Sequence, residues 1–355
     1  ALSNLGDLCI EGNQFDAARD AIDAVLARFP GPPDATYKKA YLLALMCEFE
    51  SARRLTLEVL RVHPTYAPAH SNLGAIASWQ NDYAGAIRHF TEALHHQPGF
   101  LDAESGLAHA LLATGDDARG WRHYEARPAG ILGAKRHAGW PGRVWEGEAR
   151  PDQALVVYGE AGLGDVLQFC RLVPLARKRV GRLVLYLQPY FVPLARLLRS
   201  LEGVDAIATT PDAIAGCELH VSVIRLPHLC GATLGRAPTP VPYLAIDDAA
   251  LAAWRRKVGA DGNFRVGLVW SGSPRAGNVD ANTIDRRRSI RLSMLAPLFD
   301  VPGVDWYSLQ KGEASAELAH VPFASRIIDW TADLHDFTDT GALAAQMDLV
   351  VSVDT

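Results

Sequence analysis

Residues 67–98 read APAHSNLGAIASWQNDYAGAIRHFTEALHHQP, and this segment decides the fold of the first third of the chain. Its apolar residues recur at helical spacing in two runs, which Asn81-Asp82 separates and Pro98 ends. Small residues at Gly74 and Ala86 allow the two predicted helices to approach each other closely. The seam between the helices is filled by larger side chains, namely Leu73, Ile76, Ile87, Phe90 and Leu94. The segment therefore predicts a hairpin of two packed helices.

The same features return at a fixed spacing in three independent registers. Small residues occupy one register at Gly6, Ala40, Gly74 and Ala108, and a second at Ala18, Ala52, Ala86 and Gly120. Prolines occupy the third register, at Pro30, Pro64 and Pro98. Each step, such as that from Gly6 to Ala40, spans 34 residues, which is the period of the tetratricopeptide helix–turn–helix unit. Residues 1–127 therefore resemble a tetratricopeptide-repeat array, which implies an α-solenoid with a concave binding face.

Asn4 and Asn72 occupy equivalent repeat positions, each within a Ser-Asn-Leu-Gly tetrapeptide. The array resembles that of the protein O-linked N-acetylglucosamine transferases, in which asparagines at this position line the concave face and hold an extended peptide. An amide offers both a donor and an acceptor, which suits sequence-independent binding of a peptide backbone. The resemblance thus implies a peptide-binding role for both residues. The alternative is that asparagine is simply common at this consensus position, and Lys38 replaces it in the second repeat.

A connector rich in glycine, proline and tryptophan follows at residues 128–150. It contains Trp140 and Trp145, whose large rings need a place to be buried. We therefore expect this connector to be ordered rather than flexible.

The pattern then changes to short apolar runs that alternate with helical segments. In residues 151–261 the predicted strands are 155–158, 182–187, 206–209 and 219–223, and the predicted helices are 166–179, 190–201 and 249–258. In residues 262–355 the predicted strands are 264–270, 305–309, 327–330 and 349–353. This alternation predicts two Rossmann-like lobes, each with a parallel, doubly wound sheet. Ligands bind such sheets at the carboxyl ends of the strands.

The first lobe opens with a strand, a glycine turn and a helix, and the turn contains Gly162, Gly164 and Asp165. The turn is not a dinucleotide fingerprint, because the third glycine is missing and the second strand ends at Gln188 instead of an acidic residue. A Walker lysine is also missing, so NAD enzymes and P-loop NTPases are disfavoured. A carboxylate beside such a turn can reach an acceptor molecule in the cleft, although Asp165 would also be favoured there as a helix cap.

The second lobe collects residues that suit a diphosphate at its strand ends. The candidates are Ser271, Gly272, Arg288, Ser289, Gln310 and Lys311. The turn at Ser271-Gly272 is expected to offer free backbone N–H groups, and the arginine run 286–288 is expected in a loop before a helix near Leu292. Cations and a helix N-terminus around one strand-end cleft favour binding of a diphosphate.

Four ordered motifs carry a more specific resemblance. They are Val266 to Gly272, Arg288-Ser289-Ile290, Ser308 to Gly312 and Ser352 to Thr355. From Trp145 onward the chain resembles the heptosyltransferase-like glycosyltransferases of the GT-B fold, in particular the bacterial branch fused to tetratricopeptide repeats. The resemblance implies that Asp165 is the general base for the acceptor hydroxyl. It places Arg288, Lys311, Asp354 and Thr355 with the other strand-end residues in the donor site.

Members of that family continue after the Ser-Val-Asp-Thr motif with further βα units. We therefore expect a chain that ends at Thr355 to have an incomplete donor site, an exposed sheet edge and no turnover of its own.

Composition sets broad limits on the function. Hydrophobic residues make up 49% of the chain, so a large core can form, and a net charge of -5 argues against a general binder of nucleic acid. The five cysteines form no C-x-x-C pair, and no apolar run is long enough for a membrane span. We expect reduced thiols in a cytoplasmic protein. No metal site is predicted, because neither the histidines nor the carboxylates have metal-ligand spacing.

Together these features predict an inverting, metal-independent glycosyltransferase that uses a nucleotide sugar, with a UDP-sugar favoured, and no cofactor. Asp165 would remove the acceptor proton, while Lys311 and Arg288 would stabilise the departing nucleoside diphosphate. The repeats would hold a protein or peptide acceptor. Two alternatives stay open: a repeat scaffold that binds peptides and carries an inactive transferase-like module, and a heptosyltransferase-like enzyme that acts on a glycan.

Overall fold

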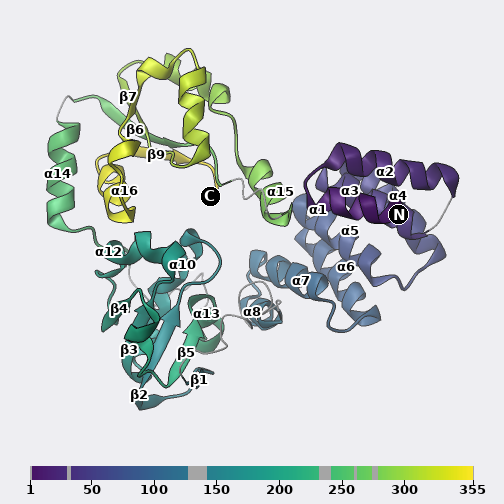
Figure 1. Ribbon diagram of the computed structural model, residues 1–355, viewed down its shortest axis with the longest axis horizontal. Coiled ribbons are helices and arrows are strands. Elements are labelled where there is room, and N and C mark those ends of the chain that lie inside the picture. The colour runs from purple at the N-terminus through teal and green to yellow at the C-terminus, as the bar shows by residue number, and fades with distance from the viewer. Residues whose placement is uncertain are drawn as a thin grey trace. The chain divides into compact units, whose positions relative to one another are not determined.

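The computed structural model describes residues 2–29, 33–126, 142–231, 241–259, 262–273 and 279–354 (Figure 1). The chain divides into two compact units, one built on Ala1–Ala138 and the other on most of the remaining residues. Of the predicted connector, residues 128–141, including Trp140, lie outside the described residues. Trp145 is fully buried and donates its indole N–H to the Glu148 carbonyl oxygen over 2.8 Å, which confirms the expected burial of this ring.

The first unit consists of helices that pack as consecutive hairpins. They are α1 (Leu2–Glu11), α2 (Phe15–Arg28), α3 (Pro33–Leu45), α4 (Phe49–Val62), α5 (Ala67–Trp79), α6 (Tyr83–His96), α7 (Leu101–Ala113) and α8 (Asp117–Glu125). The predicted seam is present in the third hairpin, where Phe90 is 3% exposed. A Cβ atom on Gly74 would lie 2.8 Å from the Phe90 ring, and one on Gly106 would lie 2.2 Å from it. Glycines on two helices thus make room for one aromatic side chain.

The backbone repeats with the same period as the sequence. The turn inside each hairpin contains one residue with positive φ, at Asn13 (58°), Cys47 (65°), Asn81 (63°) and Gly115 (80°). These positions are again 34 residues apart, and a left-handed residue of this kind commonly ends a helix. Glycine and asparagine tolerate this conformation well, whereas Cys47 does so at a cost. The N-terminal unit is therefore an array of tetratricopeptide-type helical hairpins.

The second unit contains two parallel sheets. The first has the order β1-β5-β2-β3-β4, with β1 (Arg143–Val144), β2 (Arg150–Tyr158), β3 (Val180–Tyr186), β4 (Ala206–Ala208) and β5 (Leu219–Ser222). The second has the order β8-β7-β6-β9, with β6 (Phe264–Val269), β7 (Val304–Ser308), β8 (Ile327–Asp329) and β9 (Leu349–Ser352). All recorded strand pairs are parallel. The eight predicted strands are thereby confirmed, and only the two-residue strand β1 was not foreseen.

Short helices connect these strands. Around the first sheet they are α10 (Leu163–Phe169), η1 (Cys170–Leu172), α11 (Val173–Arg177), η2 (Pro189–Leu194), α12 (Ala195–Leu198), η3 (Pro211–Ile214), η4 (Val223–Arg225) and α13 (Leu226–Cys230). Around the second they are α14 (Asp248–Val258), α15 (Val279–Arg288), η6 (Leu292–Asp300), η7 (Glu313–His320), η8 (Ala324–Arg326), η9 (Thr331–Asp333) and α16 (Phe337–Ala344). None of the described helices combines the length and the apolar character that crossing a membrane requires.

Several helix predictions were wrong in detail. The predicted helix 166–179 begins at Leu163 and breaks into α10, η1 and α11, and the predicted helix 190–201 is mainly 3-10. Pro174 and Pro193 each lack the N–H that a continuous α-helix needs. The segment after Leu292, which contains Pro297, is likewise 3-10. The arginine run 286–288 forms the last turn of α15 instead of a loop.

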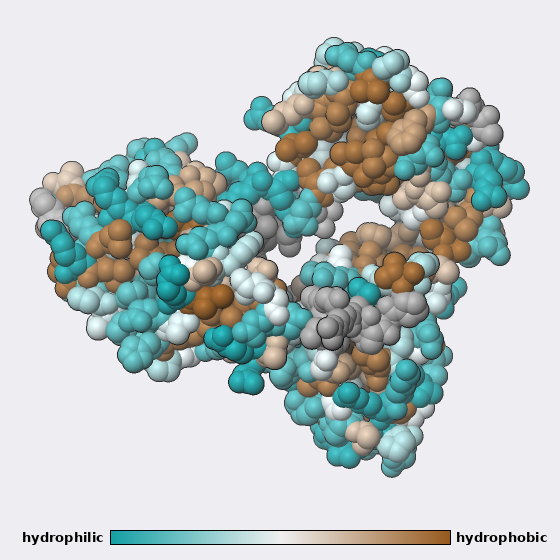
Figure 2. All heavy atoms as spheres, turned by 180° about the vertical axis from the view of Figure 1, so that it is seen from behind, coloured by the Kyte–Doolittle hydropathy of each residue, from teal (hydrophilic) through white to brown (hydrophobic). Residues whose placement is uncertain are grey.

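The edge of the second sheet is apolar and exposed. Leu349, Val350 and Val351 of β9 are 47%, 45% and 37% exposed, whereas Leu155, Val156 and Val157 in β2 are fully buried. In Figure 2, brown atoms gather over the hollowed face of the part of the unit that carries the four-stranded sheet.

The seam of the third hairpin yields a stability prediction. Replacing Phe90 with alanine should lower the free energy of unfolding of the array by about 3–5 kcal/mol, because the ring fills a space that the glycines cannot close. The matched control is Leu57→Ala, since Leu57 is 50% exposed on the neighbouring hairpin and its loss should cost no more than about 0.5 kcal/mol. Urea unfolding followed by circular dichroism measures both, and equal effects would contradict the packing described here.

Candidate functional site

The carboxyl ends of β6, β7 and β9 lie at one edge of the four-stranded sheet. Leu268 pairs with Ser308 across β6 and β7, and Val269 pairs with Ser352 across β6 and β9. Since the strands are parallel, the residues that follow them emerge side by side. The predicted donor-site residues after these strands are Ser271, Gly272, Gln310, Lys311 and Asp354, and the structure brings them to this edge. Asp354 is exposed, and Thr355 lies outside the described residues.

Gln310 is the best-connected polar side chain of this edge. It is only 3% exposed, and its Oε1 accepts hydrogen bonds from the backbone N–H groups of Trp270 (3.0 Å) and Ser271 (2.9 Å). Its Nε2 donates to the carbonyl oxygens of Ser271 and Lys311, each over 2.9 Å. The amide therefore ties the end of β6 to the end of β7 and uses its bonding capacity within the chain.

The expectation that Ser271 and Gly272 offer free N–H groups was wrong. Gln310 takes the Ser271 N–H, and the Ser289 hydroxyl oxygen accepts the Gly272 N–H over 3.0 Å. The Ser271 hydroxyl donates to the Gly272 carbonyl oxygen over 3.1 Å. The physical reason is that a partly buried turn has to satisfy its backbone donors locally. Ser289 thus has an observed role as an acceptor for the turn.

Arg288 follows the same edge and faces an acidic neighbour. Its Nε lies 3.7 Å from Oδ1 of Asp285, which is 4% exposed. A Cβ atom on Gly272 would lie 2.1 Å from that same oxygen, so only glycine fits there. Sequence reasoning missed Asp285, whose sole signal was its position three residues before Arg288 on a helix.

Lys311 places its ammonium group against the loop after β8. Its Nζ donates to the carbonyl oxygens of Thr331 (3.0 Å) and Leu334 (2.7 Å). Among the described residues no carboxylate pairs with Lys311, so its positive charge is not neutralised within that part of the chain. An ammonium group has three donors, which leaves one for another acceptor.

Asp165 lies in the first turn of α10. Its Oδ2 accepts the backbone N–H of Gly162 over 2.8 Å, so the helix-capping alternative describes what this oxygen does. Gly164 is exposed and Gly162 is half-buried. Ala161 has a φ of 62° in the same turn, a left-handed conformation that is uncommon for a residue with a Cβ atom. Sequence reasoning missed this strained position, because it looked only at the glycines.

Asn72 is buried in the repeat array. It is 4% exposed, and its Nδ2 donates to the Thr56 hydroxyl over 2.9 Å, while Thr56 donates to the Ala52 carbonyl oxygen. This arrangement agrees with a packing role and does not present the amide to a peptide. Asn4 belongs to α1, but its side chain lies outside the described part of the structure.

Comparison with known proteins identifies the repeats. The model of the tetratricopeptide repeat family matches residues 80–120. Protein FlbA of Caulobacter vibrioides is 25% identical over 375 residues, which cover 95% of this chain and 60% of that protein. The chain thus spans less than two thirds of this curated relative.

Solved structures with similarity cover about a third of the chain. A thermophilic tetratricopeptide-repeat protein of Thermus thermophilus, TTC0263, has 14% identity over 35% of this chain and 70% of its own, with a TM-score of 0.34. MamA 41-end from Desulfovibrio magneticus RS-1 has 19% identity over 35% of this chain and 70% of its own, with a TM-score of 0.31. Scores of this size carry no argument about function. The family model and the helical hairpins together show that the N-terminal unit contains tetratricopeptide repeats.

The buried amide of Gln310 yields a second stability prediction. Replacing it with alanine should cost about 2–4 kcal/mol, because the N–H groups of Trp270 and Ser271 lose their acceptor inside the protein. Gln168, which is exposed on α10, provides the control Gln168→Ala with an effect near zero. Thermal unfolding monitored by tryptophan fluorescence compares the two, and an unchanged midpoint for Gln310→Ala would contradict the assigned role.

Proposed function

We propose that this chain is a repeat scaffold that binds a polypeptide partner through its helical hairpins. The observation that carries the proposal is the run of hairpins α1–α8 with one 34-residue period in small residues, prolines and left-handed turns. Stacked repeats of this kind create extended concave surfaces that suit binding of another polypeptide. Binding of a protein partner is therefore the function that the geometry supports best.

A cluster of tyrosines gives this surface a candidate centre. The Tyr37 ring lies edge-on to Tyr66 with centroids 5.4 Å apart, and it stacks on Tyr41 at 6.4 Å. Burial raises the pKa of both Tyr37 and Tyr66, so their hydroxyls stay neutral hydrogen-bonding groups. Neither hydroxyl makes a hydrogen bond within the part of the chain that the structure describes. Half-buried tyrosines with available hydroxyls are typical of the centres of protein interfaces.

Peptide selection tests this proposal. Peptides selected from a random library on the whole chain should bind wild type and lose at least about tenfold in affinity with Tyr66→Ala, as one interface anchor is removed. Tyr83→Ala is the matched control, since Tyr83 is also half-buried but donates to Asn81 within its own turn. Isothermal titration measures both. Equal affinities for wild type and Tyr66→Ala would remove the tyrosine cluster from the binding surface, and failure to select any peptide would argue against the scaffold itself.

The α/β unit supports a second function, transfer of a sugar from a nucleotide sugar to a hydroxyl on the bound partner. The specific observation in favour is that Arg288 and Lys311, taken from separate motifs, both lie at the carboxyl edge of one parallel sheet. In this scheme the two cations stabilise the departing diphosphate, with a UDP-sugar favoured as donor. Asp165 accepts the acceptor proton through Oδ1, because Gly162 already occupies Oδ2. The two lobes would then be Rossmann-like halves of a GT-B enzyme.

Release of nucleoside diphosphate from a panel of nucleotide sugars tests this second function. With the full-length protein, one donor should give release that falls by about 100-fold or more in Asp165→Asn and in Lys311→Met, as a base or a charge at the leaving group is lost. Lys178→Met is the control, since Lys178 is exposed on the first-sheet side. Absence of release from every donor, in a protein that still binds selected peptides, would leave the scaffold as the function.

A further inference from the structure

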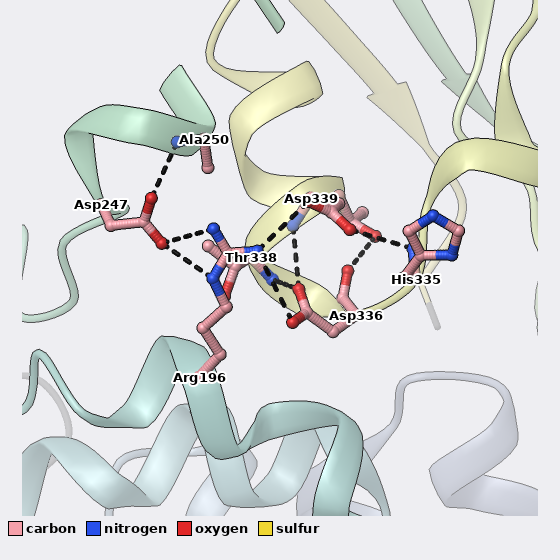
Figure 3. A network of polar contacts seen from close by, with 8 residues as sticks. Arg196, Asp247, Ala250, His335, Asp336, Thr338 and Asp339 are labelled. Atoms are coloured by element: carbon pink, nitrogen blue, oxygen red, sulfur yellow. Dashed lines mark hydrogen bonds and ion pairs between the residues drawn. The ribbon is translucent and has the colours of Figure 1, made fainter. Parts of the chain in front are cut away.

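Arg196 joins the two halves of the α/β unit. We call residues 142–231, with the five-stranded sheet, the first subdomain, and residues 248–259, 262–273 and 281–354, with the four-stranded sheet, the second subdomain. Arg196 belongs to α12 of the first subdomain, and Figure 3 shows its guanidinium group among carboxylates that come from the starts of two other helices. Its Nη2 lies 2.7 Å from Asp247 Oδ2, and its Nη1 lies 3.5 Å from Asp339 Oδ1 and 3.9 Å from Asp336 Oδ2.

Each of these carboxylates is held in place by backbone N–H groups. Asp247 caps α14 by accepting the Ala250 N–H over 2.7 Å, and Asp336 caps α16 by accepting the Thr338 N–H over 2.7 Å. Asp339 accepts the His335 N–H over 3.1 Å. The other oxygen of each carboxylate is the one that lies near Arg196 (Figure 3). The capping bonds thus fix three acceptors for a single guanidinium group.

The segment 241–247, which links the two subdomains, is itself fastened to the first one. The Tyr243 hydroxyl donates to the Leu167 carbonyl oxygen over 2.8 Å, and the Ala245 N–H donates to the Ser200 hydroxyl over 2.9 Å. After Asp247 the chain enters α14, whose Trp254 and Val258 pack with the core of the second subdomain. The change of subdomain therefore occurs where Arg196 holds Asp247.

The charges around Arg196 are unbalanced. Three carboxylates face one guanidinium group, and among the residues that the structure describes no other lysine or arginine pairs with them. Without Arg196, the negative charges of Asp247, Asp336 and Asp339 would repel one another and would lose their link to α12. The Arg196 guanidinium group therefore has two electrostatic effects: it attracts the three carboxylates to α12, and it offsets the repulsion among them.

We propose that Arg196 is a latch that sets the orientation of the two subdomains, and that its release lets them rotate about the start of α14. The arginine holds α12 against the beginnings of α14 and α16 at once. The latch acts through the position of the helices and touches no residue of the strand-end site. The test of the latch therefore requires neither of the functions proposed above.

Distance measurements between spin labels test the latch. Labels introduced through an unnatural amino acid at the exposed positions Asp212 and Asp300 report on the first and second subdomains of the whole chain. Arg196→Ala should broaden the distance distribution beyond its wild-type width. Arg199→Ala, which removes an exposed arginine one helical turn away, should leave it unchanged. The same width for wild type and Arg196→Ala would overturn the proposal.

Two further measurements separate the latch from general damage. Hydrogen exchange at the capped amides of Ala250 and Thr338 should accelerate by about tenfold in Arg196→Ala, with unchanged exchange in β2 and β3. Exchange that rises throughout the first subdomain would instead indicate loss of folding and would count against a latch. Arg196→Lys, which keeps a positive charge at this position, should narrow the distribution again relative to Arg196→Ala, and failure to do so would contradict a charge contact.

Discussion

Backbone N–H groups at strand ends and helix starts have to find acceptors, and this requirement organises the α/β unit. Gln310 and Ser289 satisfy the turn after β6, Asp165 satisfies the turn before α10, and Asp247 and Asp336 satisfy the starts of α14 and α16. A buried amide group without a partner is costly. These polar side chains therefore mainly satisfy backbone N–H groups of the fold. Only the acceptors and donors that are left over can bind another molecule.

The repeats and the strands could be predicted because their signals are periodic. Small residues at Gly74 and Ala86 indicated a close helix contact, and parallel topology alone placed Lys311 and Ser271 at one sheet edge. The left-handed turns at Asn13 and Asn81 share that period and could have been found with it. The helices around the first sheet were harder to predict. Their apolar pattern suggests continuous helices, whereas the prolines within it break them into short segments.

The use of each polar group could not be predicted from the sequence. A sequence shows that Ser271 has an N–H group, but it does not show that the side chain of Gln310, 39 positions later, accepts it. In the same way, the repeat position of Asn72 suggested a surface residue that binds a peptide. Its side chain is instead buried and donates to the Thr56 hydroxyl. Arg196 and Asp339 are 143 positions apart in the sequence, and no motif or periodic spacing predicts that they are in contact. Three-dimensional pairing decides these roles.

The exposed strand β9 has a consequence for what can pair with the second sheet. An edge strand carries a row of unpaired backbone donors and acceptors, and natural proteins usually protect such an edge with charged side chains or proline. Leu349, Val350 and Val351 instead give it an apolar surface without a single charge. A further strand, whether from this protein or from another molecule, can pair with this edge.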